Sequence, residues 1–189
     1  MGKPLFDRVD FLAAARALAG ASGPAAVTVD AVLEHVGSPK GSFYHRFTSR
    51  DVLMGELWLQ TILDYQVGFI EAIDAKEGLA AALHAALWSR AHLDEARLLM
   101  LYSRHDFVSG AWPEKLGKGV RDQARRFESC LQQFARDAFG RTDAAALRRA
   151  TFVLAEAPIA AVKPHLQRRE VPPTIVDELI TTVYRAFVP

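Results

Sequence analysis

Residues 28–51 read TVDAVLEHVGSPKGSFYHRFTSRD, and this stretch decides the fold. Its first part carries an apolar stripe at helical spacing, made by Val29, Val32, Leu33 and Val36. This spacing predicts a short helix with one buried face. Gly37 follows the stripe, and glycine readily adopts the left-handed conformation in which helices often end. The sequence therefore predicts a short helix that ends in a sharp turn.

A second short helix is expected over residues 39–47. Ser38 is placed to cap it, and Pro39 suits its first position. Phe43 and Phe47 are four residues apart, so both would anchor one side of this helix in a core. The rest of the helix is rich in hydrogen-bond donors: Lys40, Ser42, Tyr44, His45 and Arg46. Two short helices around a glycine turn, with the second anchored by aromatic rings, are typical of a helix-turn-helix DNA-binding motif.

The same stretch resembles the N-terminal signature of the TetR/AcrR family of transcriptional regulators. The matching positions are Thr28, Gly37, Lys40-Gly41, Tyr44 to Phe47, Ser49-Arg50 and Asp51. The chain departs from the family pattern at three places. These are Ser38-Pro39, where a hydrophobic residue and a serine are commoner, Leu33, where a small residue is usual, and Ala19, where an aromatic residue often closes the first helix. The first departure lies at the base-reading edge, so it bears on operator identity more than on DNA binding.

The resemblance implies a role for each polar residue of the motif. Thr28, Tyr44 and Arg50 would contact phosphates, which fix the register of a protein on the duplex. The major groove, where base edges are distinguishable, would receive Lys40, Gly41, Ser42 and His45, with Pro39 at the reading edge. The partner would be a near-palindromic, double-stranded operator bound by a homodimer.

Simpler interpretations of single residues stay open. Tyr44 alone could be a half-buried packing residue, and Lys40 and Arg46 alone could belong to a solvated face. His35 is expected to be structural or solvent-facing. The joint spacing of the motif, not any one residue, favours DNA binding.

Composition bounds the function less tightly. Half of the 189 residues are hydrophobic, which is enough for a sizeable core, and the net charge of +1 argues neither for nor against nucleic acid. Residues 40–50 nevertheless contain three cations and no acid, as expected if one small face meets phosphate. The single cysteine, Cys130, excludes an intramolecular disulfide and fits a reducing cytoplasm. Neither a signal peptide nor a membrane span is expected, and the six histidines lack zinc-type spacing.

The hydrophobic pattern is helical throughout and predicts an all-α protein of nine helices. The first would end near Gly20, and the others would cover about residues 29–36, 39–47, 48–75, 77–91, 93–107, 114–139, 143–168 and 173–187. Thr48 would cap the fourth helix, and Pro158 would kink the eighth. We expect a DNA-binding domain over residues 1–48 and an effector-binding and dimerisation domain over residues 49–189.

Two tasks are expected of the second domain, both implied by the family resemblance. An apolar or aromatic effector would bind among its helices and cause release of the operator. The candidate effector-binding residues are Trp88, Tyr102, His105, Phe127, Phe134 and Phe152. The last two helices would form an isologous dimer interface, with candidates Ala157, Ala161, Val176, Leu179, Val183 and Phe187. The alternatives are that the aromatic residues form a plain core and that the last helices cover only their own subunit.

An enzyme built on a helical bundle is a competing class. The sequence has no Gly-x-Ser-x-Gly, His-Glu-x-x-His or phosphate-binding glycine loop, so we expect no catalysis, cofactor or metal. Cys130 lies in an amphipathic segment without a nearby base, which indicates packing rather than reactivity. A binding module that has lost DNA recognition is a third possibility, and an operator-binding assay separates it from the first.

Overall fold

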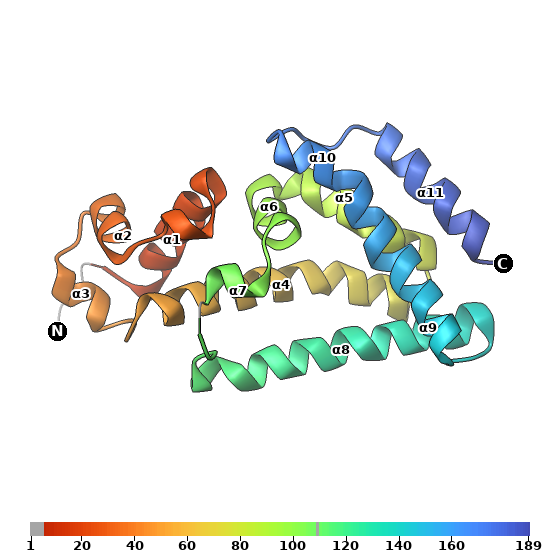
Figure 1. Ribbon diagram of the computed structural model, residues 1–189, viewed down its shortest axis with the longest axis horizontal. Coiled ribbons are helices and arrows are strands. Elements are labelled where there is room, and N and C mark those ends of the chain that lie inside the picture. Colours follow the sequence, from red (N-terminus) through yellow and green to blue (C-terminus); the bar gives the residue numbers. More distant parts are fainter. Residues whose placement is uncertain (1–5, 109) are drawn as a thin grey trace.

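The structure is a computed structural model of the chain and describes residues 6–108 and 110–189. The described residues form helices and no strands (Figure 1), which confirms the predicted all-α class. The N-terminal elements are α1 (Arg8–Ser22), the 3-10 turn η1 (Pro24–Ala26), α2 (Val29–Val36) and α3 (Lys40–Tyr44). The other elements are α4 (Arg50–Asp74), α5 (Gly78–Ala91), α6 (Leu93–Leu101), α7 (Arg104–Phe107), α8 (Glu114–Phe139), α9 (Ala144–Thr151), the π-helical turn η2 (Phe152–Glu156), α10 (Ala157–Gln167) and α11 (Ile175–Phe187).

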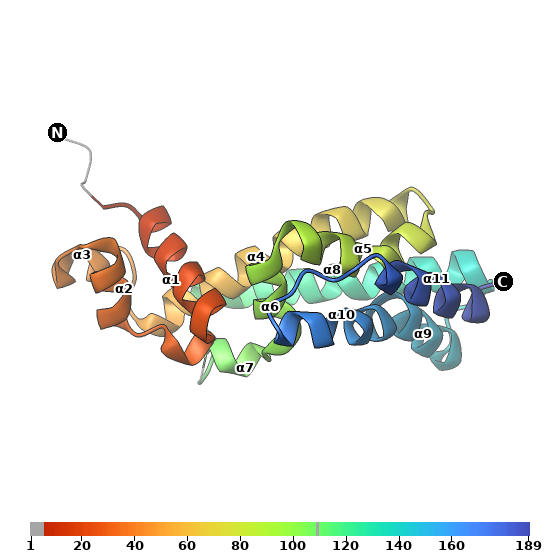
Figure 2. The same cartoon turned by 90° about the horizontal axis from the view of Figure 1, so that it is seen from above.

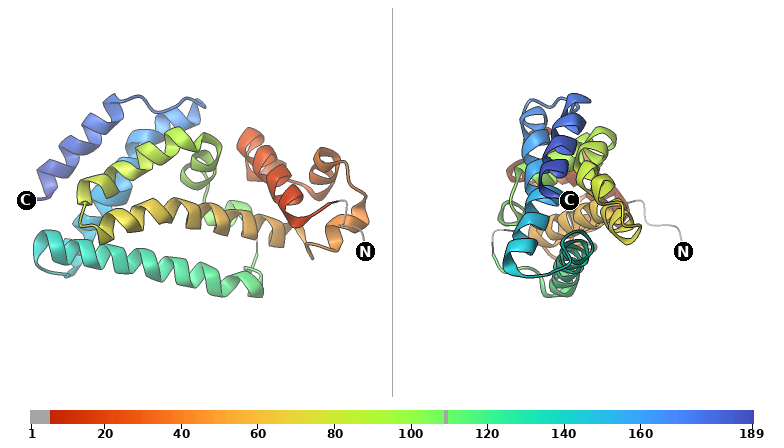
Figure 3. Two further views of the ribbon diagram at one scale, coloured as in Figure 1. Left: turned by 180° about the vertical axis from the view of Figure 1, so that it is seen from behind. Right: turned by 90° about the vertical axis from the view of Figure 1, so that its right-hand side faces the viewer.

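The long helix α4 is the axis of the molecule. In Figures 1 and 2 the helices α1 to α3 gather around its N-terminal end, whereas α5, α9 and α11 lie toward the other end. Helix α8 runs beside α4 in the same direction (Figure 3), so that Gly55 faces Leu116 and Gln66 faces Gln123. The C-terminus lies at the end of the molecule that is far from α1 to α3 (Figures 1 and 2).

Two hydrophobic cores meet along α4. The first lies under α1 to α3 and includes Leu53 and Leu57 of α4, but it also takes in Leu98 and Phe107 from α6 and α7. The second fills the helical bundle and includes Tyr65, Phe69 and Ile73 of α4. Packing is thus continuous across residue 48. The division into domains 1–48 and 49–189 stays a prediction, and residues 1–5 of the first lie outside the described residues.

The expected helix over residues 93–107 is two helices. Residues 6–108 and 110–189 therefore contain ten helices instead of nine when the continuous run α9–η2–α10 is taken as one. Ser103 ends the first segment because it caps the next one. Its backbone N–H donates to Asp106 Oδ2 at 2.6 Å, and its hydroxyl donates to the same oxygen at 2.8 Å. This reciprocal capping is a local reason to start a new helix at Arg104.

The irregularity expected at Pro158 takes the form of the π-helical turn η2, which immediately precedes α10. Proline lacks the N–H that would bond to the carbonyl of Leu154, so a wider turn accommodates the lost hydrogen bond. A second proline, Pro164, lies inside α10. The chain nevertheless continues as one helical run from Ala144 to Gln167.

Candidate DNA-binding surface

The turn between α2 and α3 has the predicted geometry. Thr28 is the N-cap of α2, and its Oγ1 accepts a hydrogen bond from the Ala31 N–H at 3.1 Å. Gly37 ends α2 with φ 71° and ψ 30°, the left-handed region that favours glycine. Its N–H donates to Leu33 O at 2.9 Å, and the Ser38 N–H donates to the same oxygen at 3.1 Å. These bonds turn the chain sharply into α3.

The predicted cap of α3 is wrong. Pro39, not Ser38, precedes the helix, and no side chain caps it. The Ser38 hydroxyl is buried and has no hydrogen-bond partner among the described residues. Helix α3 begins at Lys40 and ends at Tyr44, and a further turn follows in which the Phe47 N–H donates to Phe43 O at 2.8 Å. The predicted cap of α4 is also wrong by one residue. Ser49, and not Thr48, caps this helix, and Ser49 Oγ accepts a hydrogen bond from the Val52 N–H at 3.2 Å.

Three phenylalanine rings fix α3 on α1. Phe11, Phe43 and Phe47 are all buried. The Phe11 ring centroid lies 5.7 Å from that of Phe43 and 6.2 Å from that of Phe47, in edge-to-face arrangements that aromatic pairs favour. The predicted anchoring role of Phe43 and Phe47 is therefore confirmed, with Phe11 as their partner.

The opposite side of α3 faces outward. Tyr44 is 50 % exposed, although its ring also packs edge-on against Phe43 at 5.2 Å. Five other candidates for DNA contact are exposed, and Ser42 is half-buried; the exposed ones are Thr28, Pro39, Lys40, Gly41 and His45. A Cβ atom added at Gly41 would meet no atom within 4 Å, so the protein itself does not require glycine there.

Arg50 occupies a different place from the one expected. Its guanidinium is half-buried and donates to three backbone carbonyls, at 2.5 Å to Val27, 2.7 Å to Pro24 and 3.4 Å to Phe107. Arg46 is similarly engaged, donating to Phe6 O at 3.2 Å. Within the described residues, Lys40 is therefore the one cation of residues 40–50 without a hydrogen bond or ion pair.

Two of the six candidate ligand-binding residues line different pockets, Phe134 at the end of the bundle and Phe152 beside Phe187. Trp88 is buried against Tyr65, with ring centroids 5.2 Å apart. Tyr102 lies against Gly23 at the end of α1, and His105 is exposed on α7. Phe127 packs against Phe69, Phe152 against Phe187, and Phe134 lies at the far end of the bundle; these three belong to the same hydrophobic core as Trp88.

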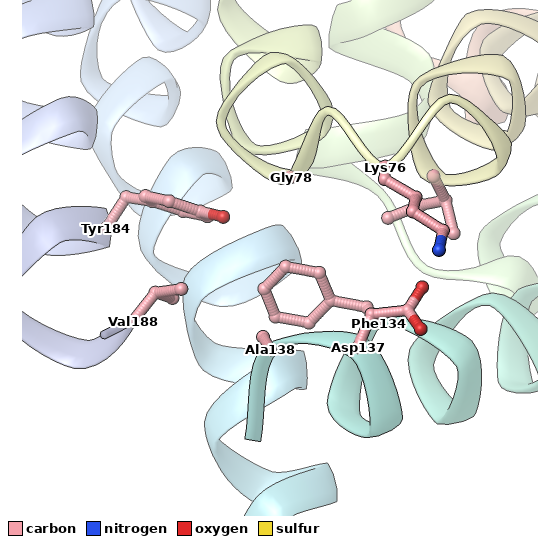
Figure 4. Close-up of a pocket in the computed structure, with 8 residues that line it drawn as sticks. Lys76, Gly78, Phe134, Asp137, Ala138, Tyr184 and Val188 are labelled. Atoms are coloured by element: carbon pink, nitrogen blue, oxygen red, sulfur yellow. The ribbon is translucent and has the colours of Figure 1, made fainter. Parts of the chain in front are cut away.

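Phe134 lines a cavity of about 280 Å³ at the end of the bundle that lies away from α1 to α3. Figure 4 shows its ring and that of Tyr184 forming the apolar walls, with Lys76 and Asp137 on one side. Gly78 borders the cavity, and a Cβ atom added there would collide with the Tyr184 hydroxyl and the Phe134 ring. Partial burial raises the pKa of Tyr184 above its ordinary value. The site combines two aromatic rings with a few polar groups, as small-molecule sites do.

The sequence pattern did not predict the polar residues that lie buried between the helices. Gln66 of α4 donates to Gln123 Oε1 of α8 at 3.0 Å, and Gln66 Oε1 has no partner among the described residues. His84 Nε2 lies 2.7 Å from Tyr65 O, and desolvation lowers the pKa of this imidazole. The signal available was a glutamine inside the apolar stripe of the fourth predicted helix.

The candidate dimer residues divide between two faces. Val176 is 1 % exposed and belongs to the core of its own subunit, so its place at a subunit interface is wrong. It shares this inward face with Ile180, one helical turn further on, and Arg90 of α5 holds the start of α11 through two hydrogen bonds to Asp177, at 2.8 and 3.0 Å. Leu179 and Phe187 are 55 % and 45 % exposed. Ala157, Ala161 and Val183 are half-buried.

In residues 6–108 and 110–189, no helix is long and apolar enough to cross a bilayer. No cluster of three or more His, Cys, Asp or Glu side chains there is arranged to hold a metal ion.

A sharp glycine turn, a short exposed helix and an aromatic anchor beneath it define a helix-turn-helix protein. Residues 11–57 match the family model of bacterial regulatory proteins of the tetR family. This match covers the helix-turn-helix, and the family is the one that the N-terminal sequence predicted.

Solved structures agree with this fold. A protein from Shewanella sp. PV-4, described as a tetR family transcription regulator, superimposes with a TM-score of 0.66 at 15 % identity. The match covers 96 % of this chain and 98 % of that one. Another from Mesorhizobium loti MAFF303099 gives a TM-score of 0.53 at 15 % identity, over 96 % of each chain. No curated protein sequence matches the chain.

Proposed function

We propose that the protein is a repressor that binds a near-palindromic operator as a homodimer. The observation that carries this proposal is the two-sided character of α3: Phe43 is buried beneath it, whereas Lys40 and Tyr44 project outward beside Gly41. A short helix held from behind, with exposed donors in front, suits insertion into the major groove. Such a regulator acts on DNA in the cytoplasm.

The residues would divide between phosphates and bases. Tyr44 and Thr28 would contact phosphates, because both are exposed at the edges of the motif. The N-terminal end of α2 adds backbone N–H groups that favour an anion near Thr28. Base edges would be read by Lys40, Ser42 and His45, with Pro39 and Gly41 allowing close approach. A phosphate contact by Arg50 would require it to give up carbonyl partners at Val27 and Pro24.

Dimerisation would use α10 and α11. The outward face of α11 carries Ile175 and Leu179, one helical turn apart and both at least half exposed. Phe187 and Phe152 pack against each other at the far end of this helix, with ring centroids 5.2 Å apart. Two copies related by a two-fold axis would bury these side chains in an isologous interface on the order of 2,000 Å².

The effector would be a small apolar or aromatic molecule that weakens operator binding. The cavity beside Phe134 and Tyr184 supports this, because its volume of about 280 Å³ suits a single ring with a polar substituent. Its walls come from α4, α5, α8 and α11, so a bound molecule would touch both the axial helix and the proposed dimer helix. We propose no catalytic activity.

Selection of bound duplexes from a random DNA pool tests the proposal, followed by fluorescence anisotropy on the selected site. We expect a near-palindromic consensus. Tyr44→Ala should weaken binding to all sequences, whereas Lys40→Ala should also relax base preference at one symmetric pair of positions, by about 1–3 kcal/mol. His92→Ala is the matched control, since His92 is exposed at the end of α5, away from α3. Wild-type affinity of both α3 variants at every salt concentration would refute DNA reading by α3.

A further inference from the structure

The C-terminal end of α1 lacks a cation of its own and receives one from a distant segment. Its last turn contains no basic residue, and its terminal carbonyls carry partial negative charge. Arg169, just beyond α10, donates from Nη1 to Ala21 O at 2.9 Å and from Nη2 to Gly20 O at 3.3 Å. Figures 1 and 2 both place the end of α10 next to this end of α1. The bundle therefore holds the DNA-binding helices at a point remote from α4.

Arg169 adopts a backbone conformation that usually belongs to glycine. Helix α10 ends with the Arg169 N–H donating to Leu166 O at 3.1 Å and the Glu170 N–H donating to His165 O at 3.0 Å. This pair of bonds is a Schellman motif, in which the residue at the position of Arg169 is left-handed and is most often glycine. Arg169 has φ 60°. Glycine is favoured in this conformation, so the backbone alone does not explain the arginine.

The end of α10, which Arg169 follows, is itself held by the bundle. Arg97 of α6 is buried and donates to Leu166 O, the carbonyl that also accepts from the Arg169 N–H. Helix α6 additionally contacts α1 directly, because Asp94 packs against Gly20. Arg169 thus extends from a rigid support and not from a loose loop.

At its other end α1 is coupled to α3. Phe11 of α1 contacts the rings of Phe43 and Phe47 around α3. Arg8 of α1 donates to Arg46 O and lies 4.1 Å above the Phe47 ring. A rotation of α1 would therefore carry α3 with it.

We propose that Arg169 is a positioning residue for DNA binding, which sets the orientation of α1, and hence of α3, relative to the bundle. Its effect on DNA rests on the proposed function, whereas its effect on α1 does not. The neighbouring Arg168 provides a matched control, since it lies at φ −84° and pairs with Glu170 at 2.9 Å, not with α1. Replacing either arginine by glutamine removes the same charge from the same surface.

The first measurement is an electron-spin distance between α1 and α8 within one chain. Spin labels at Ala17→Cys and Glu128→Cys, both exposed positions, are introduced with Cys130→Ser, and labelled protein is diluted with unlabelled protein to suppress distances between chains. We expect a broader distance distribution for Arg169→Gln and Arg169→Gly, an unchanged one for Arg168→Gln, and recovery in Arg169→Lys. Because glycine suits the backbone, a merely local role predicts no broadening in Arg169→Gly. An unchanged distribution in Arg169→Gly would overturn the proposal, whatever Arg169→Gln shows.

The second measurement is affinity for the selected operator at one salt concentration. Arg169→Gln should bind more weakly than Arg168→Gln by about fivefold or more, the lower end of typical coupling between sites. Equal affinities would overturn the positioning role in DNA binding, even if the distances broaden. If the wild-type protein binds no DNA, the proposed function fails, and the distance measurement still decides whether Arg169 orients α1.

Discussion

Arg50 at the start of α4 donates a hydrogen bond of 2.7 Å to the carbonyl oxygen of Pro24 in η1. The same guanidinium reaches Val27 O and, in α7, Phe107 O. One side chain thus joins the axial helix, the turn after α1 and the short helix α7. These hydrogen bonds give Arg50 a structural role within the protein, whereas the family resemblance implied a phosphate contact.

Arg50→Gln should destabilise the protein. Hydrogen bonds from a charged donor contribute about 1.5–3 kcal/mol each, and the glutamine amide reaches fewer carbonyls. We expect a lower midpoint in urea, measured by circular dichroism without DNA. An unchanged midpoint together with weaker operator binding would instead assign Arg50 to phosphate contact.

Two glycines of the motif should respond in opposite ways to alanine. Neither has an atom within 4 Å of an added Cβ, so crowding within the protein plays no part. Gly37→Ala places a side chain at φ 71° and should lower the unfolding free energy by about 1–2 kcal/mol. Gly41→Ala, inside α3, should raise it by about 0.5–1 kcal/mol.

Operator binding gives the second half of that comparison. Gly41→Ala should weaken it despite the gain in stability, because a methyl group would separate α3 from the groove. Wild-type affinity of the stabilised Gly41→Ala protein would contradict close approach at Gly41.

Neighbouring faces of α11 should also be separable. Leu179→Asp changes an exposed side chain and should yield folded monomers, whereas Val176→Asp buries an unpaired carboxylate in the core and should unfold the chain. Sedimentation and circular dichroism distinguish the two results. A stable dimer of Leu179→Asp would place the interface elsewhere.

Stability should fall in mildly acidic solution because of His84. Desolvation lowers the folded-state pKa of this imidazole below its ordinary value of 6.5, so the unfolded chain binds the proton more readily. The contribution of neutral His84 is complete above about pH 6.5 and is lost as the pH falls toward the lowered folded-state pKa. Urea titrations at pH 7.5 and 5.5 should show a smaller loss for His84→Gln than for the wild type. Equal losses would remove His84 as the cause.

Local features of this fold were predictable from the sequence. Gly37, Phe43 and Phe47 act within a few residues of one another, so spacing alone predicted the turn and the aromatic anchor. Capping by Ser49 and not Thr48 was missed because both residues can cap a helix and only backbone geometry chooses between them.

Contacts between distant segments were not predictable. Arg50 and Arg169 both read as surface cations, yet each donates to backbone carbonyls of the N-terminal unit. Nothing in their neighbouring residues specifies an acceptor that lies 26 or 148 positions away in the sequence. Likewise, helical spacing grouped Val176 with Leu179, whereas in the structure Val176 is buried with Ile180 and Leu179 is exposed.

The shared core along α4 limits how the protein can be re-engineered. A chimaera that joins residues 6–48 to another bundle would lose Leu53 and Leu57 from beneath α1 to α3, together with Leu98 and Phe107. Such a graft would expose Phe11 and Phe43 to water unless the new host supplied side chains of matching shape. A graft of the DNA-binding part would therefore need α1 to α3 together with the first half of α4, and a host surface that replaces α6 and α7.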